Sequence, residues 1–257
     1  MSKKHPIISI ITVVYNGVDL LEGTIKSVIA QDTTHVEYIV VDGASTDGTL
    51  ALIEKYEAHI DRWVSEPDKG LYDAMNKALQ LATGDFVWFM NCGDHVYTPD
   101  TVAKMLAAYT PDTDILYGEV MMVDEARQPI GTRSEITAHR LPQVLHWKSL
   151  QYGMVVSHQA FLPRRTIAPS YMDGNLSADI DWVITCLKRS KKNTATQLVL
   201  ATFLIGGVSK QRHWEGLKNR YTVLAKHYGF IPNLFHHCFI IMRAAWYKLV
   251  RKREANY

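Results

Sequence analysis

Residues Phe86–Tyr97 read FVWFMNCGDHVY, and this stretch decides the fold. The apolar run Phe86–Met90 is typical of a strand that is buried on both faces. It ends abruptly in small and polar residues, among which Asp94 carries a carboxylate. In open α/β sheets, ligands bind beyond the carboxyl ends of the strands. The stretch therefore predicts an inner strand of such a sheet, with a ligand-facing carboxylate at its tip.

The first ninety residues alternate between apolar β-branched runs and amphipathic segments. Strands are predicted at Ile7–Val14, Glu37–Val41, Arg62–Ser65 and Asp85–Met90, and helices at Val18–Ala30, Thr49–Ala58 and Leu71–Ala82. Strands that are apolar throughout, separated by helices with one apolar face, favour a parallel sheet covered on both sides. We therefore predict the α/β class for this half of the chain.

The second half of the sequence is less regular. Strands are predicted at Ile115–Val123, Ile130–Thr132, Val155–Phe161 and Leu198–Leu204, and a helix at Ala178–Leu187. No internal repeat, low-complexity segment or linker interrupts the 257 residues, a length that suits one large domain with an appendage. We predict a main domain over residues 1–212 and a C-terminal helical extension over residues 213–257.

Composition excludes several classes of protein. The formal net charge of +2 argues against a protein that coats nucleic acid. Cys92, Cys186 and Cys238 are too few and too far apart for a disulfide framework or a metal site, which favours a reducing, cytoplasmic compartment. The apolar run after the two N-terminal lysines is too short for a signal peptide or a membrane span, and it is better interpreted as a strand.

Loops rich in small and acidic residues follow the four strands predicted in the first half. These loops are Tyr15–Asn16, Asp42–Gly48, Glu66–Gly70 and Asn91–Asp94. The second loop has the glycine spacing of a phosphate-binding loop, but Thr49 stands where that motif requires lysine. Its carboxylates favour hydrogen bonds to a base or ribose, or a cation that binds phosphate in turn. Asp42 and Asp47 have the alternative interpretation of turn or helix-cap residues.

Ordered segments along the chain resemble the family 2 glycosyltransferases, in particular those of bacterial exopolysaccharide and colanic-acid synthesis. The segments are ISIITVVYN (8–16), YIVVDGASTDGT (38–49), SEPDKGLYDAMNKALQLATGD (65–85) and FMNCGD (89–94), followed more thinly by SHQAF (157–161), ADIDW (178–182) and GGVS (206–209). The resemblance implies the nucleotide-diphospho-sugar transferase (GT-A) fold, a Rossmann-like α/β sandwich. It also implies an inverting hexosyl transfer from a nucleotide-diphospho-sugar to a hydroxyl of a lipid-linked or growing surface glycan.

The resemblance further implies which residues bind the donor. In this family the acidic residue that ends the second strand contacts the base, which places Asp42 there, with the turn from Thr12 to Tyr15 beside it. The segment from Asp68 to Asn76 would line the donor cleft. The complete implied donor set is Thr12, Val14, Tyr15, Asp42, Asp68, Lys69, Asn76, Asn91, Gly93 and His158. His158 and Gln159 match a recurrent pair that would face the acceptor or the diphosphate, and the alternative for His158 is a structural histidine.

The family binds its metal with a pair of aspartates after the fourth strand, and this chain departs from that pattern. Gly93 precedes Asp94, so the resemblance implies Asp94 alone as the protein carboxylate for Mn²⁺ or Mg²⁺. Gly93 would then allow the backbone to approach the ligand. His95 is either a further ligand or a solvated turn histidine. The departure also leaves an alternative function open, a catalytically degenerate sugar-nucleotide-binding protein.

The segment ADIDW matches the part of the family that supplies the catalytic base, which implies this role for Asp179. An inverting transfer needs a base to accept the proton of the attacking hydroxyl. Asp179 and Asp181 point in different directions on a helix, so they cannot share the role. The alternative for either is favourable charge at a helix N-terminus.

The C-terminal segment from Phe235 combines an apolar stripe with basic residues. The stripe consists of Phe235, Phe239, Met242, Trp246, Leu249 and Val250. A basic amphipathic helix of this kind can lie on an anionic membrane surface. We therefore predict a peripheral contact with the inner face of the plasma membrane, with packing on the domain or in an oligomer interface as the alternatives.

Overall fold

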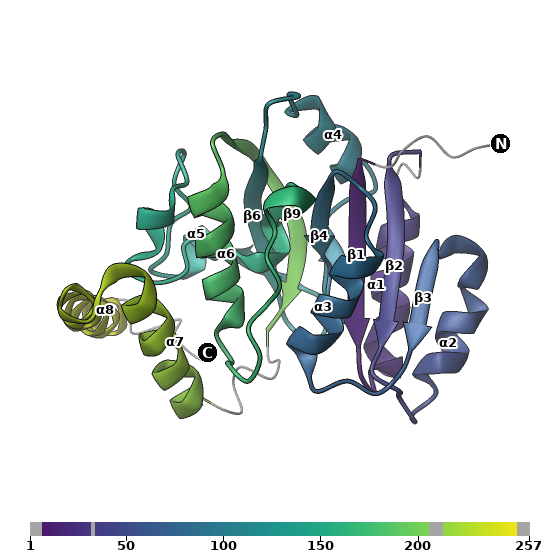
Figure 1. Ribbon diagram of the computed structural model, residues 1–257, viewed down its shortest axis with the longest axis horizontal. Coiled ribbons are helices and arrows are strands. Elements are labelled where there is room, and N and C mark those ends of the chain that lie inside the picture. The colour runs from purple at the N-terminus through teal and green to yellow at the C-terminus, as the bar shows by residue number, and fades with distance from the viewer. Residues whose placement is uncertain (1–6, 32–33, 206–212, 251–257) are drawn as a thin grey trace.

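The computed structural model of the protein describes residues 7–31, 34–205 and 213–250 (Figure 1). The GGVS segment and the basic residues from Arg251 onward lie outside these ranges.

A four-stranded parallel sheet forms the first half of the molecule. Its strands β1 (Ile8–Val14), β2 (Val36–Asp42), β3 (Arg62–Ser65) and β4 (Phe86–Phe89) lie in the order β3-β2-β1-β4. The parallel pairing confirms the sequence prediction. All four of these strands lie within two residues of their predicted bounds. For β1, β2 and β4 the reason is that an uninterrupted apolar run is a strong signal for a strand buried on both faces.

Helices cover both faces of this sheet. The helices are α1 (Val18–Ile29), α2 (Thr49–Lys55) and α3 (Leu71–Leu81). The side chains of Ile11 and Val13 pack with those of α3, whereas Ile8 and Ile10 pack with α1 and α2. This division follows from the alternation of side chains along a strand. The arrangement leaves the carboxyl ends of the strands, with their loops, along one edge of the sheet (Figure 1).

A second, mixed sheet continues the first. Its long strands β6 (Ile115–Val123) and β9 (Asn193–Leu204) are parallel, and the strand order is β5-β9-β6-β7, with β8 paired to β6. The shorter elements of this region are β5 (His95–Val96), α4 (Thr101–Ala107), β7 (Pro129–Thr132), α5 (Arg133–Ile136), β8 (Phe161–Pro163) and α6 (Ala178–Arg189). A bridge between Phe86 and Arg164 joins the two sheets.

The prediction of a strand at Val155–Phe161 is wrong. Residues His158–Ala160 form a single 3₁₀ turn, and β8 begins only at Phe161. The Ala160 N–H donates to Ser157 O at 3.0 Å, which closes the turn, and His158 and Gln159 are both buried within it. The Ser157 hydroxyl donates to Gln159 Oε1 at 2.7 Å, a local bond that competes with strand pairing.

Two helices follow the second sheet, α7 (His213–Tyr228) and α8 (Phe230–Val250). Gly229, with φ of +88°, separates them. Helix α7 is fastened to α6 through Asp181, whose Oδ1 lies 2.9 Å from Lys226 Nζ and 2.7 Å from His227 Nε2. Both helices therefore pack on the end of the molecule that α5 and α6 form (Figure 1). Among the helices described, none is long and apolar enough to cross a membrane.

Candidate functional site

Three loops meet at the carboxyl ends of β1, β2 and β3. A Cβ atom added to Gly43 would lie 2.4 Å from Asp68 Oδ2 and 3.2 Å from Tyr15 Cδ2, so these three residues are in close contact. A side chain at position 43 would displace the Asp68 carboxylate from this contact. The Tyr15 side chain is 66% exposed beside this junction. The loops thus form an open platform that offers an aromatic ring and a carboxylate.

Asp42 lies beneath this platform and is fully buried. Its Oδ2 atom accepts hydrogen bonds from Ser45 N at 3.0 Å and Ser65 Oγ at 2.6 Å, and its Oδ1 atom accepts from the Ser45 hydroxyl. The carboxylate therefore ties the β2 loop to the end of β3. Because the Asp42 side chain is fully buried, a direct contact with a base would require the covering loop to move.

Thr12 and Val14 support the platform from inside the sheet. Thr12 is fully buried, and its hydroxyl donates to Met90 O at 2.8 Å and lies 3.1 Å from Tyr38 Oη. Val14 is also buried. Of the predicted residues on the first strand and its turn, Tyr15 is the one whose side chain reaches the surface.

Asp47 acts as a cap for two helices, as its alternative interpretation expects. Its Oδ2 atom accepts from Val18 N at 3.1 Å, at the start of α1, and its Oδ1 atom accepts from Thr49 N at 3.0 Å, at the start of α2. The Thr49 hydroxyl also donates to Oδ1, and these bonds hold the pKa of Asp47 below its usual value. Asp47 shapes the loop and does not present a free carboxylate.

Asp94 is buried at the turn that follows β4. Its Oδ2 atom accepts from Gln159 Nε2 at 2.9 Å, and its Oδ1 atom accepts from Leu204 N at 3.3 Å. Burial raises the pKa of Asp94 to about 7, because these two donors compensate only part of the lost hydration. A cation next to Asp94 would favour its charged form.

The chemistry of the β4 turn fits a hard divalent cation. Asn91 Oδ1 is buried and has no hydrogen-bond partner in the described part of the chain. Asp94 and Asn91 together offer carboxylate and amide oxygens, the ligand type that Mg²⁺ and Mn²⁺ prefer. Within the described ranges no group of three or more His, Cys, Asp or Glu side chains is arranged to hold a metal. A cation here would complete its shell with diphosphate oxygens and water.

Gly93 is required by its backbone conformation. Its φ is +99°, and an added Cβ atom would meet nothing closer than Leu20 Cδ1 at 3.5 Å. Its N–H donates to Thr24 Oγ1 at 3.0 Å, and its carbonyl accepts from Arg127 Nη1. The sharp turn, and not a lack of space, therefore explains the glycine at this position.

His95 packs into the molecule against α1. A Cβ atom added to Gly23 would lie 2.6 Å from His95 Nε2, and this nitrogen is buried without a hydrogen-bond partner among the described residues. Burial lowers the pKa of His95 to about 4. The interpretation as a solvated turn histidine is therefore wrong.

Asp179 begins α6 and is partly buried. The Tyr72 hydroxyl lies 3.4 Å from its Oδ1 atom. Burial raises the pKa of Asp179 to about 6, against hydrogen bonds from the Ile180 N–H and Tyr72 that lower it. Asp181 differs, because its ion pairs with Lys226 and His227 outweigh the effect of burial and lower its pKa. Of the two aspartates, Asp179 is the carboxylate that is free to take up a proton near neutral pH.

An aromatic cluster lies between the two carboxylates with raised pKa. His158 Nε2 lies 2.7 Å from Tyr171 Oη, and the His158 ring contacts Phe89 and Trp182. Burial lowers the pKa of His158 to about 4, so its imidazole is neutral. Tyr171 stacks on Tyr72, the residue that reaches Asp179. His158 therefore has the surroundings of a structural histidine.

Asn76 and Lys69, two further residues predicted to bind the sugar donor, make hydrogen bonds within the protein. Asn76 Nδ2 donates to Tyr171 O at 3.0 Å, and Tyr171 N donates to Asn76 Oδ1 at 2.7 Å. The Asn76 amide thus holds the backbone at Tyr171 against α3. Lys69 is exposed, and its backbone N–H donates to Asp73 Oδ2 at 3.0 Å.

The sequence did not single out Tyr72 within the segment from Asp68 to Asn76, and it matched Gln159 only as the partner of His158 in a recurrent pair that faces the acceptor or the diphosphate. Gln159 hydrogen-bonds to Asp94, and Tyr72 contacts Asp179. Both residues lie within segments that carry the family resemblance, SHQAF and the run from Ser65 to Asp85. The signal was present, but only the fold shows that these side chains reach the carboxylates.

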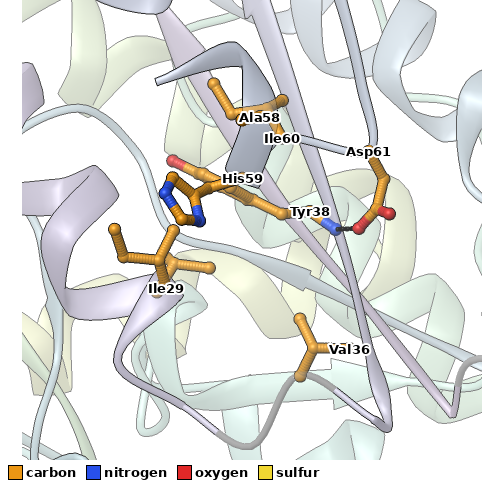
Figure 2. Close-up of a pocket in the computed structure, with 8 residues that line it drawn as sticks. Ile29, Val36, Tyr38, Ala58, His59, Ile60 and Asp61 are labelled. Atoms are coloured by element: carbon orange, nitrogen blue, oxygen red, sulfur yellow. Dashed lines mark hydrogen bonds between the residues drawn. The ribbon is translucent and has the colours of Figure 1, made fainter. Parts of the chain in front are cut away.

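A small cavity of about 170 Å³ lies at the opposite edge of the sheet, where α1 ends and β2 begins (Figure 2). Ile29, Val36 and Ile60 line it with apolar atoms, and Asp61 Oδ2 accepts from Tyr38 N at 3.0 Å beside it. It is remote from the loops described above and takes no part in the candidate site.

Comparison with known proteins decides the family. The sequence model of "Glycosyl transferase family 2" matches residues 9–168. The chain belongs to this family. It is 31% identical over 191 residues to a "PGL/p-HBAD biosynthesis glycosyltransferase" of Mycobacterium bovis, covering 70% of each chain.

Other relatives match a shorter part of the chain. An uncharacterised glycosyltransferase of Mycobacterium tuberculosis is 38% identical over 132 residues, which cover 49% of this chain and 50% of the relative. A putative teichuronic acid biosynthesis glycosyltransferase of Bacillus subtilis, TuaG, is 38% identical over 110 residues, or 41% and 43% of the two chains. The chain thus spans about half the length or less of these two relatives.

Solved structures show the same fold. S. aureus TarS, residues 1–349, has a TM-score of 0.69 at 19% identity, covering 96% of this chain and 76% of TarS. The Pyrobaculum calidifontis mannosyltransferase PcManGT, solved with GDP-Man and Mn²⁺, has a TM-score of 0.63 at 17% identity, with the same shares covered. The GT-A fold implied by the sequence is therefore confirmed.

Proposed function

We propose that this family member is an inverting, metal-dependent glycosyltransferase of the hexosyltransferase type. It would move a sugar from a nucleotide-diphospho-sugar to a hydroxyl of a bacterial surface glycan. The observation that carries the proposal is the pair of carboxylates with raised pKa, Asp94 at the β4 turn and Asp179 at the start of α6, on either side of one aromatic cluster. The glycan-synthesis names of the relatives support the same function.

The donor would bind along the loops at the carboxyl ends of the strands. The Tyr15 ring and the Asp68 carboxylate suit stacking and hydrogen bonding to a base and ribose. Asp94 and Asn91 would hold Mn²⁺ or Mg²⁺, which neutralises charge on the departing diphosphate. Gln159 orients the Asp94 carboxylate through its hydrogen bond.

Asp179 would act as the general base. Its raised pKa of about 6 leaves it ionised at neutral pH and basic enough to accept the proton of the acceptor hydroxyl. The attack of that hydroxyl on the anomeric carbon, opposite the diphosphate, gives inversion. Tyr72 donates to Asp179 and would hold its orientation.

The acceptor would be lipid-linked and reached at a membrane surface. Helix α8 exposes the described members of its apolar stripe, Phe235, Phe239, Met242 and Trp246, by between 45% and 69%. Exposed aromatic side chains of this kind insert at the boundary between headgroups and acyl chains. In this proposal residues 1–212 form the catalytic domain, and the extension 213–257 contacts the inner face of the plasma membrane.

Substitution of Asp94 tests the function. We expect Asp94→Asn to lower sugar transfer by about 100-fold or more, since a metal contributes several kcal/mol at the leaving group. The melting temperature should stay within a few degrees of the wild type, because the amide keeps the shape of the carboxyl. Asp112→Asn, in an exposed aspartate that pairs with Lys192, is the matched control. Near-normal transfer by Asp94→Asn in Mn²⁺ buffer would contradict the assignment of Asp94 as the metal ligand.

The alternative of a degenerate binding protein is favoured by one observation, the turn at Gly93 that replaces the family's first aspartate. A thermal-shift screen of nucleotide diphosphates and sugar nucleotides, with and without Mn²⁺, separates the two functions when it is run beside a transfer assay. A ligand that binds the native state raises the melting temperature. Metal-dependent binding without transfer or hydrolysis by the wild type would favour the alternative.

A further inference from the structure

Three arginines from separate helices gather around His139, at the end of the molecule where α5, α7 and α8 meet (Figure 1). Arg133 begins α5, Arg220 lies on α7 and Arg243 lies on α8. Arg243 Nη2 lies 3.3 Å from His139 Nδ1 and donates to Tyr152 O at 2.9 Å. Burial, reinforced by the charges of all three arginines, lowers the pKa of His139 to about 3. The three residues form an arginine cluster around a neutral imidazole.

Two arginines of this cluster, Arg220 and Arg243, have little compensation for their positive charge. Arg220 Nε is buried and has no hydrogen-bond partner among the described residues. Among the described residues, neither Arg220 nor Arg243 pairs with a carboxylate. Burial lowers the pKa of both guanidinium groups. Because burying an unpaired cation costs several kcal/mol, this arrangement is suited to an anion that binds from outside.

Other polar atoms near the cluster also lack partners. Of the eight buried side-chain polar atoms without a hydrogen bond in the described ranges, four lie on α7 and α8. Besides Arg220 Nε they are Asn233 Oδ1, His236 Nδ1 and His237 Nε2. Since native interiors satisfy nearly all such atoms, their concentration on two helices indicates a polar site that a ligand or ordered water completes.

The arginine cluster lies on the same side of the molecule as Asp179, the proposed base. The charge of Arg133 reaches Asp179 and lowers the pKa of that carboxyl. The Arg133 guanidinium also donates to Met154 O, which fixes it beside the loop that leads to His158. Asp94, where the donor diphosphate would lie, is affected by the charge of Arg127, which lies outside the cluster. The cluster is therefore linked to Asp179, on the acceptor side.

We propose that Arg133, Arg220 and Arg243 bind a phosphate group of the acceptor, so that the acceptor is a phosphorylated or diphosphate-linked molecule. Guanidinium groups present forked donors that match phosphate oxygens, and several together select a multiply charged group. The inference rests on the proposed transferase function, because it uses Asp179 as the point of acceptor attack. The shared chemistry is a phosphate-type anion, which the acceptor or the donor's own diphosphate could supply.

Calorimetric titration of the full chain tests the site with two probes. The first is inorganic pyrophosphate in metal-free buffer containing EDTA, and the second is UDP or GDP with Mn²⁺. We expect Arg220→Gln combined with Arg243→Gln to weaken pyrophosphate binding by about tenfold or more, since each lost charge-assisted bond contributes roughly 1.5 kcal/mol or more. Nucleotide affinity should stay within twofold. Lys218→Gln combined with Lys191→Gln, at two exposed lysines, removes the same charge as a control.

Two results would overturn the proposal. One is equal pyrophosphate binding by the wild type and the arginine variant, and the other is a parallel loss of nucleotide affinity, which would assign the cluster to the donor. If the double variant does not fold, Arg220→Gln alone gives the answer, because that side chain has no described hydrogen bond to lose. Should the wild type fail to bind nucleotide at all, the metal-free titration still reports on the arginine cluster independently of Asp94.

Discussion

At the scale of single residues, the carboxylates of this protein differ mainly in whether their surroundings favour the neutral or the charged form. Asp94 and Asp179 are left with few partners and have raised pKa values. Asp47 and Asp181 are surrounded by donors or cations, which lower theirs. Groups whose pKa values are pushed apart in this way are typical of catalytic sites, whereas satisfied carboxylates are typical of structural ones.

The pH dependence of catalysis follows from Asp179. A base with a pKa of about 6 must be ionised to act, so kcat should fall about tenfold for each pH unit below that value. The measurement is kcat between pH 4.5 and 8 at saturating donor and Mn²⁺, which keeps Asp94 in its charged form. A rate that stays constant down to pH 4.5 would contradict the role of Asp179.

The Asp179 carboxyl also affects stability, but its contribution to stability falls as the pH rises, whereas kcat increases. Its pKa is higher in the folded protein than the usual 3.8, so between about pH 4 and pH 6 the folded state binds more protons than the unfolded state. Stability from this group is therefore present at low pH and lost as the pH rises through 6, by on the order of 1–3 kcal/mol. We expect Asp179→Asn to melt above the wild type at pH 7, with the difference vanishing near pH 4.

Asp181→Asn provides the matched control, because the pKa of Asp181 is shifted in the opposite direction to that of Asp179. The pKa of Asp181 is lowered, so its stabilising ion pairs are present above about pH 4 and are lost as the pH falls. This variant should melt below the wild type at pH 7. If both asparagine variants shift the melting temperature in the same direction at pH 7, the difference described between the two aspartates is wrong.

At the scale of elements, Asn76 connects α3 to the backbone before α6. Asn76→Ala would leave the N–H and C=O of the buried Tyr171 without partners, at a cost of about 2–3 kcal/mol of unfolding free energy. Chemical denaturation measures this loss. Gln80→Ala, at an exposed position on the same helix, should change it by less than about 0.5 kcal/mol. Unchanged stability with weakened nucleotide binding would restore Asn76 as a donor-binding residue.

Strands and helices of the first half could be predicted from the sequence because local pattern and burial agree there. The bounds predicted for the strands at Ile7–Val14, Glu37–Val41 and Asp85–Met90 each lie within one residue of those observed. The pattern failed at residues 155–161, where a side-chain hydrogen bond at Ser157 and two buried polar residues replace strand pairing. Elements of two to four residues, such as β5 and α5, carry too little periodicity to be detected.

The candidate site was only partly predictable for a similar reason. The sequence places Asp42, Asp68, Asp94 and the Tyr15 turn at one sheet edge, as expected for strand ends. It does not show that Ser45 and Ser65 occupy the Asp42 carboxylate. Such partners come from different strands, so they become visible only when the chain is folded.

At the scale of the whole molecule, α8 divides its residues between two environments. Arg243, which the sequence pattern assigns to a basic amphipathic helix, points inward to Tyr152 and His139. Most of the described apolar stripe points outward, with Trp246 and Phe235 each 69% exposed, whereas the Phe239 ring packs on Tyr152 at a centroid distance of 4.9 Å. The outward face of the helix is therefore more apolar than its sequence alone indicates.

Full-chain membrane binding tests this surface. We expect a variant with serine in place of Phe235, Phe239, Met242 and Trp246 to co-sediment more than about tenfold less with vesicles of anionic phospholipid. The reason is that each apolar side chain buried in the membrane contributes up to about 1.5–3 kcal/mol to binding. Ile130→Ser with Val144→Ser, which removes exposed apolar side chains elsewhere, is the control. Unchanged partitioning of the stripe variant would dispose of the membrane contact.

The turn at Gly93 also limits how this lineage can change. Installing the family's first aspartate would force an L-residue with a side chain into φ of +99°, at a cost of roughly 1–2 kcal/mol. It would also bring a new anion near the aliphatic groups of Leu20 and Leu204, beside a carboxylate already short of hydration. A single Gly93→Asp substitution is thus unfavourable, and an engineer would do better to rebuild the loop before adding the charge.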